Sequence, residues 1–257
     1  MLLNIKNLTK RFGGLTAVSN VSFGIERGEI IGIFGPNGSG KTTTLSLIAG
    51  ILKPTSGEIV WKGEVINALT PFEVAQQGLV KTFQNPQLFP ELTVAEHMRI
   101  ACHLHVKRAL GLGRLKTLLG KGATGDLEKT LSKKIDQMLE LCRLYKHRND
   151  EAGALSYGGE KMLGVAMGMV CDPELLLLDE PASGLGHDEI TNLDAVLRDL
   201  KTHGVTLCII DHKVGFLGRL ADRSIALHHG AVIASGTTAE VLANDAVVTA
   251  YLGKKHA

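Results

Sequence analysis

GPNGSGKTT, residues Gly35–Thr43, begins directly after a short apolar run, Ile30–Phe34, and its last residues open the helix-like segment KTTTLSLIAG. The segment fits the pattern G-x-x-x-x-G-K-[ST], and it lies where a predicted strand ends and a predicted helix begins. Glycines in such a turn let backbone N–H groups point inward, and the helix N-terminus adds the positive end of its dipole. The stretch therefore predicts a phosphate-binding loop rather than a glycine-rich turn with an unrelated lysine.

Two side chains of this loop have the chemistry that a nucleoside triphosphate requires. In this pattern Lys41 reaches the β- and γ-phosphates, and the Thr42 hydroxyl binds Mg²⁺. ATP and Mg²⁺ are accordingly the expected cofactors. The predicted nucleotide-binding residues of the loop are Gly35, Pro36, Asn37, Gly38, Ser39, Gly40, Lys41, Thr42 and Thr43.

A pair of carboxylates ends a second apolar strand, in LLLLDEP (residues 175–181). Asp179 can complete the magnesium shell, and Glu180 can polarise a water molecule for attack on the γ-phosphate. Taken alone, the pair could equally be an exposed strand end. Its combination with the phosphate loop favours catalysis.

A second anion-binding turn is predicted in LSYGGEK (residues 155–161). It has a serine, two glycines and an acidic residue before an apolar helical run, so Ser156, Gly158 and Gly159 could present N–H and hydroxyl groups at a helix start. One nucleotide does not need two such turns. Their coexistence on one chain requires an explanation.

The order of predicted elements indicates an α/β fold with a helical insertion. Period-two patterns fill the first third, and strands alternate with helices in the last third, which ends in a hairpin-like pair, residues 223–236. Between them, from Thr93 to about Arg148, the pattern becomes helical and includes a basic, glycine-rich stretch around Gly111–Gly125. The expected core is an open, mostly parallel sheet.

Composition excludes several classes of protein. The 257 residues hold 28 basic and 26 acidic side chains, so no strong positive field indicates a nucleic-acid partner. The four cysteines lack C-x-x-C spacing, and at least three lie in apolar runs as small core residues, which favours a reducing compartment. Polar residues interrupt the apolar N-terminus, and no run approaches the ~18 apolar residues of a membrane span. We therefore expect any membrane role to depend on another protein.

Together these motifs resemble those of the ATP-binding subunits of ABC transporters, and the resemblance covers nearly the whole chain. Phe12 in KRFGG is similar to the aromatic that stacks on adenine, although its position also suits a core aromatic. Gln84 in KTFQNPQLF resembles the glutamine that couples the magnesium site to the helical lobe. His212 in IIDHKVG resembles the switch histidine that contacts the γ-phosphate. The resemblance thus implies catalytic roles for Glu180, His212 and Gln84, and metal ligation by Thr42, Gln84 and Asp179.

The resemblance also implies a use for the second turn. In this family two subunits pack head to tail, and each serine-glycine signature closes over the ATP held by the partner's phosphate loop. Ser156, Gly158 and Gly159 would therefore bind nucleotide in trans. The implied fold is a single P-loop NTPase domain of ABC type over residues 1–257. It has a core with an N-terminal antiparallel β subdomain (1–92 and 150–257) and a helical subdomain (93–149).

Within the family, the segments KTFQNPQLFPELTVAEH, LSYG and DEPASGL resemble the larger ATPase of branched-chain amino-acid uptake systems and of related amide and urea systems. This resemblance implies a second ATPase subunit, two transmembrane permease subunits, a solute-binding protein and a peripheral place on the cytoplasmic face of the bacterial inner membrane. DHKV and the ending YLG are also similar to the ATPase that extracts lipopolysaccharide. A non-transport ABC ATPase acting on DNA or ribosomes, and a P-loop kinase, are further alternatives.

Four residues depart from the family pattern near the expected subunit interface. Glutamine is usual where Gly159 stands, with the acidic Glu160 following here, and arginine is usual at Met167. An aspartate or asparagine is common where Gly186 follows DEPASGL. These departures concern the strength of dimer closure and not the nucleotide site itself.

Overall fold

The computed structural model describes residues 1–102 and 121–252, with residues 121–127 and 252 described by their backbone alone. The chain forms two compact units. The core unit comprises Met1–Gln84, Glu174–Ser183 and Leu200–Ala257, and the helical unit comprises Asn85–Pro173 and Gly184–Asp199. This division differs from the predicted boundaries, because the chain re-enters the helical unit at Gly184, after the carboxylate pair Asp179 and Glu180. Most of the basic stretch around Gly111–Gly125 lies outside the described residues.

The larger sheet of the core unit has six strands in the order β10-β9-β3-β8-β7-β6. The central strands β3, β8 and β7 are buried at every residue, as expected for parallel strands covered on both faces. β10 pairs antiparallel with β9, and all other pairs are parallel. The prediction of a mixed, mostly parallel sheet is confirmed. The strands are β3 (Ile30–Phe34), β6 (Leu79–Lys81), β7 (Leu175–Asp179), β8 (Thr206–Ile210), β9 (Arg223–His228) and β10 (Ala231–Gly236).

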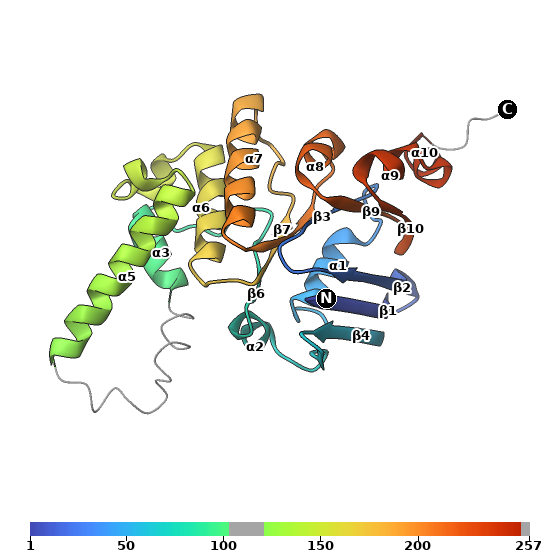
Figure 1. Cartoon of the computed structure of the whole chain (residues 1–257), viewed down its shortest axis with the longest axis horizontal. Coiled ribbons are helices and arrows are strands. Elements are labelled where there is room, and N and C mark those ends of the chain that lie inside the picture. Colours follow the sequence, from blue (N-terminus) through green and yellow to red (C-terminus); the bar gives the residue numbers. More distant parts are fainter. Residues whose placement is uncertain (103–120, 253–257) are drawn as a thin grey trace. The chain divides into compact units, whose positions relative to one another are not determined.

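The smaller sheet of the core unit is antiparallel, with the order β2-β1-β4-β5. Figure 1 shows its three longer strands side by side, coloured from blue to teal. The period-two pattern of the N-terminal third produces these strands, because alternate residues face the core. The strands are β1 (Leu3–Phe12), β2 (Leu15–Ile25), β4 (Ser56–Trp61) and β5 (Glu64–Val65).

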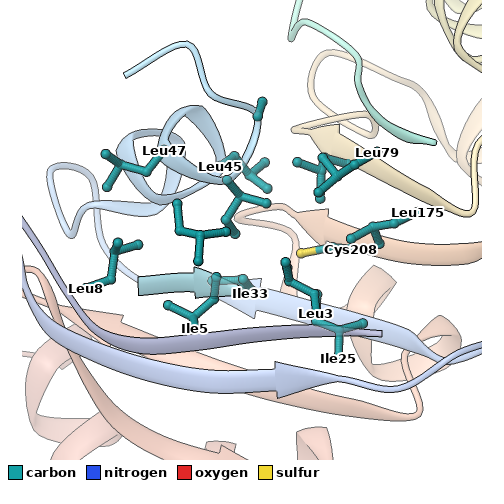
Figure 2. Close-up of a cluster of buried hydrophobic side chains, with 14 of the residues drawn as sticks. Leu3, Ile5, Leu8, Ile25, Ile33, Leu45, Leu47, Leu79, Leu175 and Cys208 are labelled. Carbon is teal, nitrogen blue, oxygen red and sulfur yellow. The ribbon is translucent and has the colours of Figure 1, made fainter. Parts of the chain in front are cut away.

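Helix α1 (Lys41–Ile48) joins the two sheets through one apolar core. Figure 2 shows Leu45 and Leu47 of α1 above apolar side chains that come from strands of both sheets. Burying these side chains fixes α1, and with it the end of the phosphate loop, against the two sheets. The other helices of the core unit are α2 (Pro71–Gln76), α8 (Val214–Leu220), α9 (Thr238–Ala243) and α10 (Asp245–Leu252).

The helical unit contains the expected amphipathic helix. In α5 (Lys121–Leu141) the side chains of Ile135 and Leu139 are buried, and Cys142 is buried directly after the helix. No helix among the described residues is long and apolar enough to cross a membrane. The remaining elements are α3 (Val94–Ala101), the 3₁₀ turns η1 (Tyr145–His147) and η2 (Ala152–Ala154), α6 (Tyr157–Met169) and α7 (His187–Thr202), whose last turn belongs to the core unit.

The shared core predicts the effect of a cavity in the central sheet. Leu177 in β7 is fully buried, so Leu177→Ala should lower the free energy of unfolding by about 2–5 kcal/mol. Leu242 on α9 is exposed, and Leu242→Ala should change it by less than about 0.5 kcal/mol. Urea unfolding followed by circular dichroism measures both variants. Equal effects of the two substitutions would contradict this assignment of the core.

Candidate functional site

The phosphate loop of the core unit connects β3 to α1, as the sequence predicts. Glycine is required at two of its positions because the chain passes close to other backbone. A Cβ atom on Gly35 would lie 2.1 Å from the Leu227 carbonyl oxygen, and one on Gly40, where φ is +97°, would lie 2.5 Å from the Ala17 carbonyl oxygen. The loop is therefore a closely packed backbone turn.

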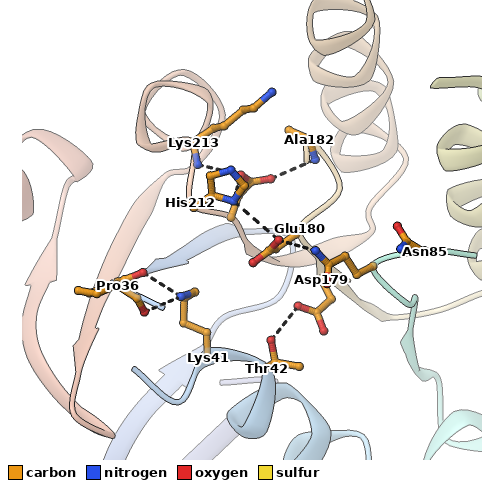
Figure 3. Close-up of polar contacts among 12 residues, drawn as sticks. Pro36, Lys41, Thr42, Asn85, Asp179, Glu180, Ala182, His212 and Lys213 are labelled. Atoms are coloured by element: carbon orange, nitrogen blue, oxygen red, sulfur yellow. Dashed lines mark hydrogen bonds and ion pairs between the residues drawn. The ribbon is translucent and has the colours of Figure 1, made fainter. Parts of the chain in front are cut away.

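Lys41 folds back onto this loop. Its ammonium group donates to the carbonyl oxygens of Gly35 at 2.8 Å and Pro36 at 3.0 Å, as Figure 3 shows for Pro36. Burial lowers the pKa of Lys41, while the carboxylates of Glu180, Asp179 and Asp211 act in the opposite direction. The lysine is thus a buried cation held mainly by backbone carbonyl groups.

Two further features of the loop suit an anionic ligand. In the described part of the chain, Ser39 Oγ is buried without a hydrogen-bond partner, a state that normally calls for a ligand or water. The N-cap of α1 is Gly40, so no side chain caps the N–H groups that begin this helix. Both the hydroxyl and these N–H groups can donate to phosphate oxygens.

An open pocket of about 440 Å³ lies beside the loop. Phe12 and Leu15 line it together with loop residues and Glu180. Phe12 is 45% exposed, so its position is not that of a core aromatic, and its ring face can stack on a planar base. The structure thus places the predicted adenine-stacking residue at the mouth of the phosphate loop.

The two carboxylates lie at the carboxyl end of β7, close to the start of α1. Thr42 Oγ1 donates to Asp179 Oδ1 at 3.3 Å (Figure 3). Lys81 Nζ lies 3.0 Å from Asp179 Oδ2. Gln84 Nε2 donates to Glu180 Oε2 at 2.6 Å, and His212 Nδ1 lies 3.7 Å from the same oxygen. Predicted residues from four separate segments therefore meet in one cluster.

Glu180 has a left-handed backbone conformation, with φ of +48°. In a residue other than glycine this conformation is strained, and such strain often accompanies a functional site. The Glu180 N–H donates to the carbonyl oxygen of Ile210 at 2.8 Å, and this bond fixes the turn. The strained backbone aims the carboxylate at Gln84 and His212.

Asp211, which the sequence motifs did not identify, organises the turn beside this cluster. Its carboxylate is fully buried and accepts the N–H groups of Ala182 at 3.0 Å and Lys213 at 2.8 Å. Figure 3 shows these two bonds on either side of His212. Asp211 therefore connects the segment after Glu180 to the segment that carries His212.

The serine-glycine turn lies in the helical unit, at the start of α6. Ser156 is the N-cap, and its Oγ accepts the N–H of Gly159 at 3.1 Å. A Cβ atom on Gly158 would lie 2.3 Å from Glu189 Oε1, so the carboxylate of Glu189 packs directly on this glycine. The three predicted signature residues thus lie at one helix start.

Contacts within the helical unit also hold the turn from both sides. The Tyr157 hydroxyl donates to Asn85 Oδ1 at 3.3 Å, and the Tyr157 ring would meet a Cβ atom on Gly184 at 2.6 Å. Asn85 and Gly184 are the residues at which the chain enters the helical unit. A pocket of about 310 Å³ adjoins the signature and is lined by Ser156, Gly158, Gly159, Arg143 and Lys161, among others.

The residues that depart from the family pattern all lie in the helical unit. Glu160 lies in the first turn of α6, where its charge suits the helix dipole, and Met167 lies in the same helix. Gly186 N–H donates to Glu189 Oε2 at 3.0 Å. The acceptor that caps this backbone group therefore comes from α7.

Comparison with family models gives two matches. Residues 18–183 match the model described as "ABC transporter". Residues 231–257 match the model described as "Branched-chain amino acid ATP-binding cassette transporter".

Curated relatives match over almost their whole length. The high-affinity branched-chain amino acid transport ATP-binding protein LivG of Salmonella typhimurium is 38% identical over 98% of both chains. The corresponding protein BraF of Pseudomonas aeruginosa is 35% identical over 98% of both chains.

Solved structures agree with these matches. The ADP conformation of MJ1267, an ATP-binding cassette of an ABC transporter, has a TM-score of 0.83 at 28% identity, covering 98% of this chain and 99% of that one. The dimeric structure of MJ0796, a bacterial ABC transporter cassette, has a TM-score of 0.76 at 25% identity, covering 92% and 99%.

Removing the buried Asp211 carboxylate should affect both the stability of the fold and the exchange of two nearby amides. Asp211→Ala removes the acceptor of two N–H groups, so the free energy of unfolding should fall by about 2 kcal/mol or more. Amide hydrogen exchange at Ala182 and Lys213 should accelerate. The exposed Asp245 provides the control, because Asp245→Ala should change neither amide. Unchanged exchange at both amides in Asp211→Ala would contradict the role of this carboxylate.

Proposed function

The chain belongs to the ABC transporter family, and on that basis we propose which of its residues bind and hydrolyse ATP and what the transporter carries. Proteins of this family are transport ATPases, and the chain is an ATPase of this kind. The observation that carries the site assignment is the single cluster in the core unit. There the Glu180 carboxylate, held by Gln84 and near His212, lies on the wall of the pocket that contains the phosphate loop.

The proposed nucleotide site uses the phosphate loop and Phe12. The adenine ring stacks on Phe12, and the phosphates accept hydrogen bonds from backbone N–H groups of the loop residues 37–43 and from the hydroxyl of Ser39. Lys41 exchanges its carbonyl partners for the β- and γ-phosphates, because a charge-assisted bond to phosphate is stronger than one to a neutral carbonyl.

The residues around Asp179 suit Mg²⁺. The ion prefers oxygen ligands and keeps several of them from substrate phosphates and water. The Thr42 hydroxyl, the Asp179 carboxylate and the Gln84 amide oxygen provide such ligands at the edge of the phosphate loop. When bound, Mg²⁺ offsets negative charge on the phosphates.

Hydrolysis in this site is phosphoryl transfer to water. Glu180 accepts a proton from the attacking water while that oxygen forms its bond to the γ-phosphorus, and the bond to the ADP oxygen breaks. Lys41 offsets the charge of the transferring group. His212 orients the γ-phosphate end of the nucleotide, and Gln84 holds Glu180 in place.

We assign the signature to the nucleotide of a partner subunit. ABC cassettes work as dimers in transporters that have membrane components. In such a dimer, Ser156, Gly158 and Gly159 complete the site around the γ-phosphate bound by the partner's loop. This assignment gives each of the two anion-binding turns its own nucleotide.

The proposed transporter takes up branched-chain amino acids or related small polar solutes. The relatives LivG and BraF, and the family match at residues 231–257, support this choice. The proposed assembly contains a second ATPase subunit, two permease subunits and an external solute-binding protein. The chain would lie on the cytoplasmic face of the inner membrane, bound to the permeases.

Affinity purification of the tagged chain from membranes, followed by labelled leucine uptake into vesicles, tests the transport proposal. Permease subunits and ATP-dependent uptake are the expected results. Recovery with ribosomes or nucleic acid, or with components that export lipopolysaccharide, would contradict it.

Glu180→Gln tests the catalytic assignment. The amide cannot accept the proton, so the rate of ATP hydrolysis should fall by about 100-fold or more, whereas ATP binding should persist. Phosphate release and fluorescent-nucleotide binding measure the two properties. Glu64→Gln, in the exposed strand β5, is the matched control and should hydrolyse ATP normally. Normal turnover by Glu180→Gln would refute the assignment.

Gly158→Ala tests the signature. The added methyl group would collide with Glu189 and displace either its carboxylate or the start of α6, so ATP hydrolysis by the assembled dimer should fall by about tenfold or more. Nucleotide binding by the chain's own loop should change by less than about twofold. Gly218→Ala is the control, because a Cβ atom on Gly218 would lie 3.6 Å from Thr238 Cγ2, an ordinary van der Waals contact. Loss of monomeric nucleotide binding in Gly158→Ala would argue against action in trans.

A further inference from the structure

A buried ion pair lies at the proposed metal site, and its cation, Lys81, has no role in the motifs described above. Lys81 Nζ lies 3.0 Å from Asp179 Oδ2, and the two side chains are only 6% and 4% exposed. The same ammonium group donates to the Thr82 carbonyl oxygen at 3.2 Å. Little solvent is available to screen this pair. The positive charge of Lys81 therefore acts strongly on groups close to Asp179.

The register of the central sheet makes this pair. Lys81 is the last residue of β6 and lies opposite Leu177 of β7 in a parallel ladder. Residues in register face the same side of a sheet, and so do residues two apart on one strand. Lys81 therefore shares its face with Asp179, two residues beyond Leu177, and its long side chain reaches the carboxylate.

Both oxygens of Asp179 are engaged by the chain itself. Thr42 Oγ1 donates to Oδ1, and Lys81 occupies Oδ2. The other nearby lysine, Lys41, donates its hydrogen bonds to the carbonyl groups of Gly35 and Pro36. Lys81 is thus the cation in direct contact with the carboxylate that would hold magnesium.

We propose that Lys81 is a built-in counter-ion of Asp179 that weakens the binding of Mg²⁺ to this site. The proposal rests on the nucleotide site assigned above. A buried carboxylate without a partner is unfavourable, so Lys81 provides a partner that orients Asp179 in the absence of a metal. The same positive charge repels an incoming divalent cation. Metal therefore binds well only together with the negative phosphates of a nucleotide.

The positive charge of Lys81, rather than its size, is responsible for this effect. Lys81→Met keeps most of the side-chain length and removes the charge, whereas Lys81→Arg keeps the charge. Lys6 forms an exposed ion pair with Glu58 on the other sheet, so Lys6→Met changes the net charge equally without touching the site. The three variants separate local charge from packing and from total charge.

Direct metal binding provides the test. Mn²⁺, which is detected by electron paramagnetic resonance, is titrated into the chain alone and into the chain carrying one equivalent of ADP. In Lys81→Met the dissociation constant for Mn²⁺ should fall by on the order of tenfold in both titrations. Lys81→Arg and Lys6→Met should stay within about twofold of the unchanged chain. An unchanged or higher constant in Lys81→Met would overturn the proposal.

Two further measurements distinguish a failure of the Lys81 proposal from a failure of the proposed nucleotide site and from misfolding of the variant. Binding of fluorescent ADP to the unchanged chain, with and without the metal, tests the nucleotide site alone, and its absence would reject the proposed function rather than the role of Lys81. If Lys81→Met does not fold, Lys81→Gln provides the same test, because its amide can donate to Asp179 without a charge. Lys81→Gln should likewise bind Mn²⁺ more tightly, and weaker binding would overturn the proposal.

Discussion

The parallel sheet of the core unit brings the carboxyl ends of its strands to one edge, and the candidate site depends on this constraint. The phosphate loop follows β3, Glu180 follows β7, His212 comes two residues after β8, and Gln84 lies three residues beyond β6. These segments are far apart in the sequence, yet they are neighbours because their strands are neighbours. In open α/β sheets ligands bind at this edge for the same reason. Any change that shifts the strand order or register would therefore dismantle the whole cluster at once.

This geometry also concentrates charge. Asp179, Glu180 and Asp211 approach one another at the edge, and two of the three are almost fully buried. Each has fixed partners: Lys81 and Thr42 for Asp179, Gln84 for Glu180, and backbone N–H groups for Asp211. The partners keep the carboxylates in place without nucleotide. The arrangement is therefore preorganised for a ligand that supplies both negative phosphates and a metal, because little of the protein must reorganise when the ligand binds.

The sequence predicted those parts of the site that form within one segment. The phosphate loop depends on local glycines and on the strand and helix beside it, so its pattern was sufficient. The pair at Asp179 and Glu180 was ambiguous within its own segment, and its combination with the phosphate loop indicated catalysis. Lys81 and Asp211 were not predicted, because their roles arise from the register between β6 and β7 and from a turn that closes only in the folded chain. The division into units was also hard to predict, since the second entry into the helical unit, after Ser183, follows no change in composition.

Contacts within the helical unit limit how the helix start of the signature can bind an anion. Ser156 Oγ accepts the N–H of Gly159, one of the groups that would donate to a partner's phosphate. In the proposed dimer this N–H would either donate to both acceptors or exchange Ser156 for the phosphate. The free energy gained on closure would then be only the difference between a charge-assisted and a neutral hydrogen bond. Glu189 packs on Gly158 and caps Gly186, placing a carboxylate beside the same turn. In the proposed dimer, negative charge near an incoming phosphate would oppose closure, and the released N–H groups would favour it. The balance between these two effects would then set the strength of closure, since the phosphate loop supplies the same donors whatever its partner.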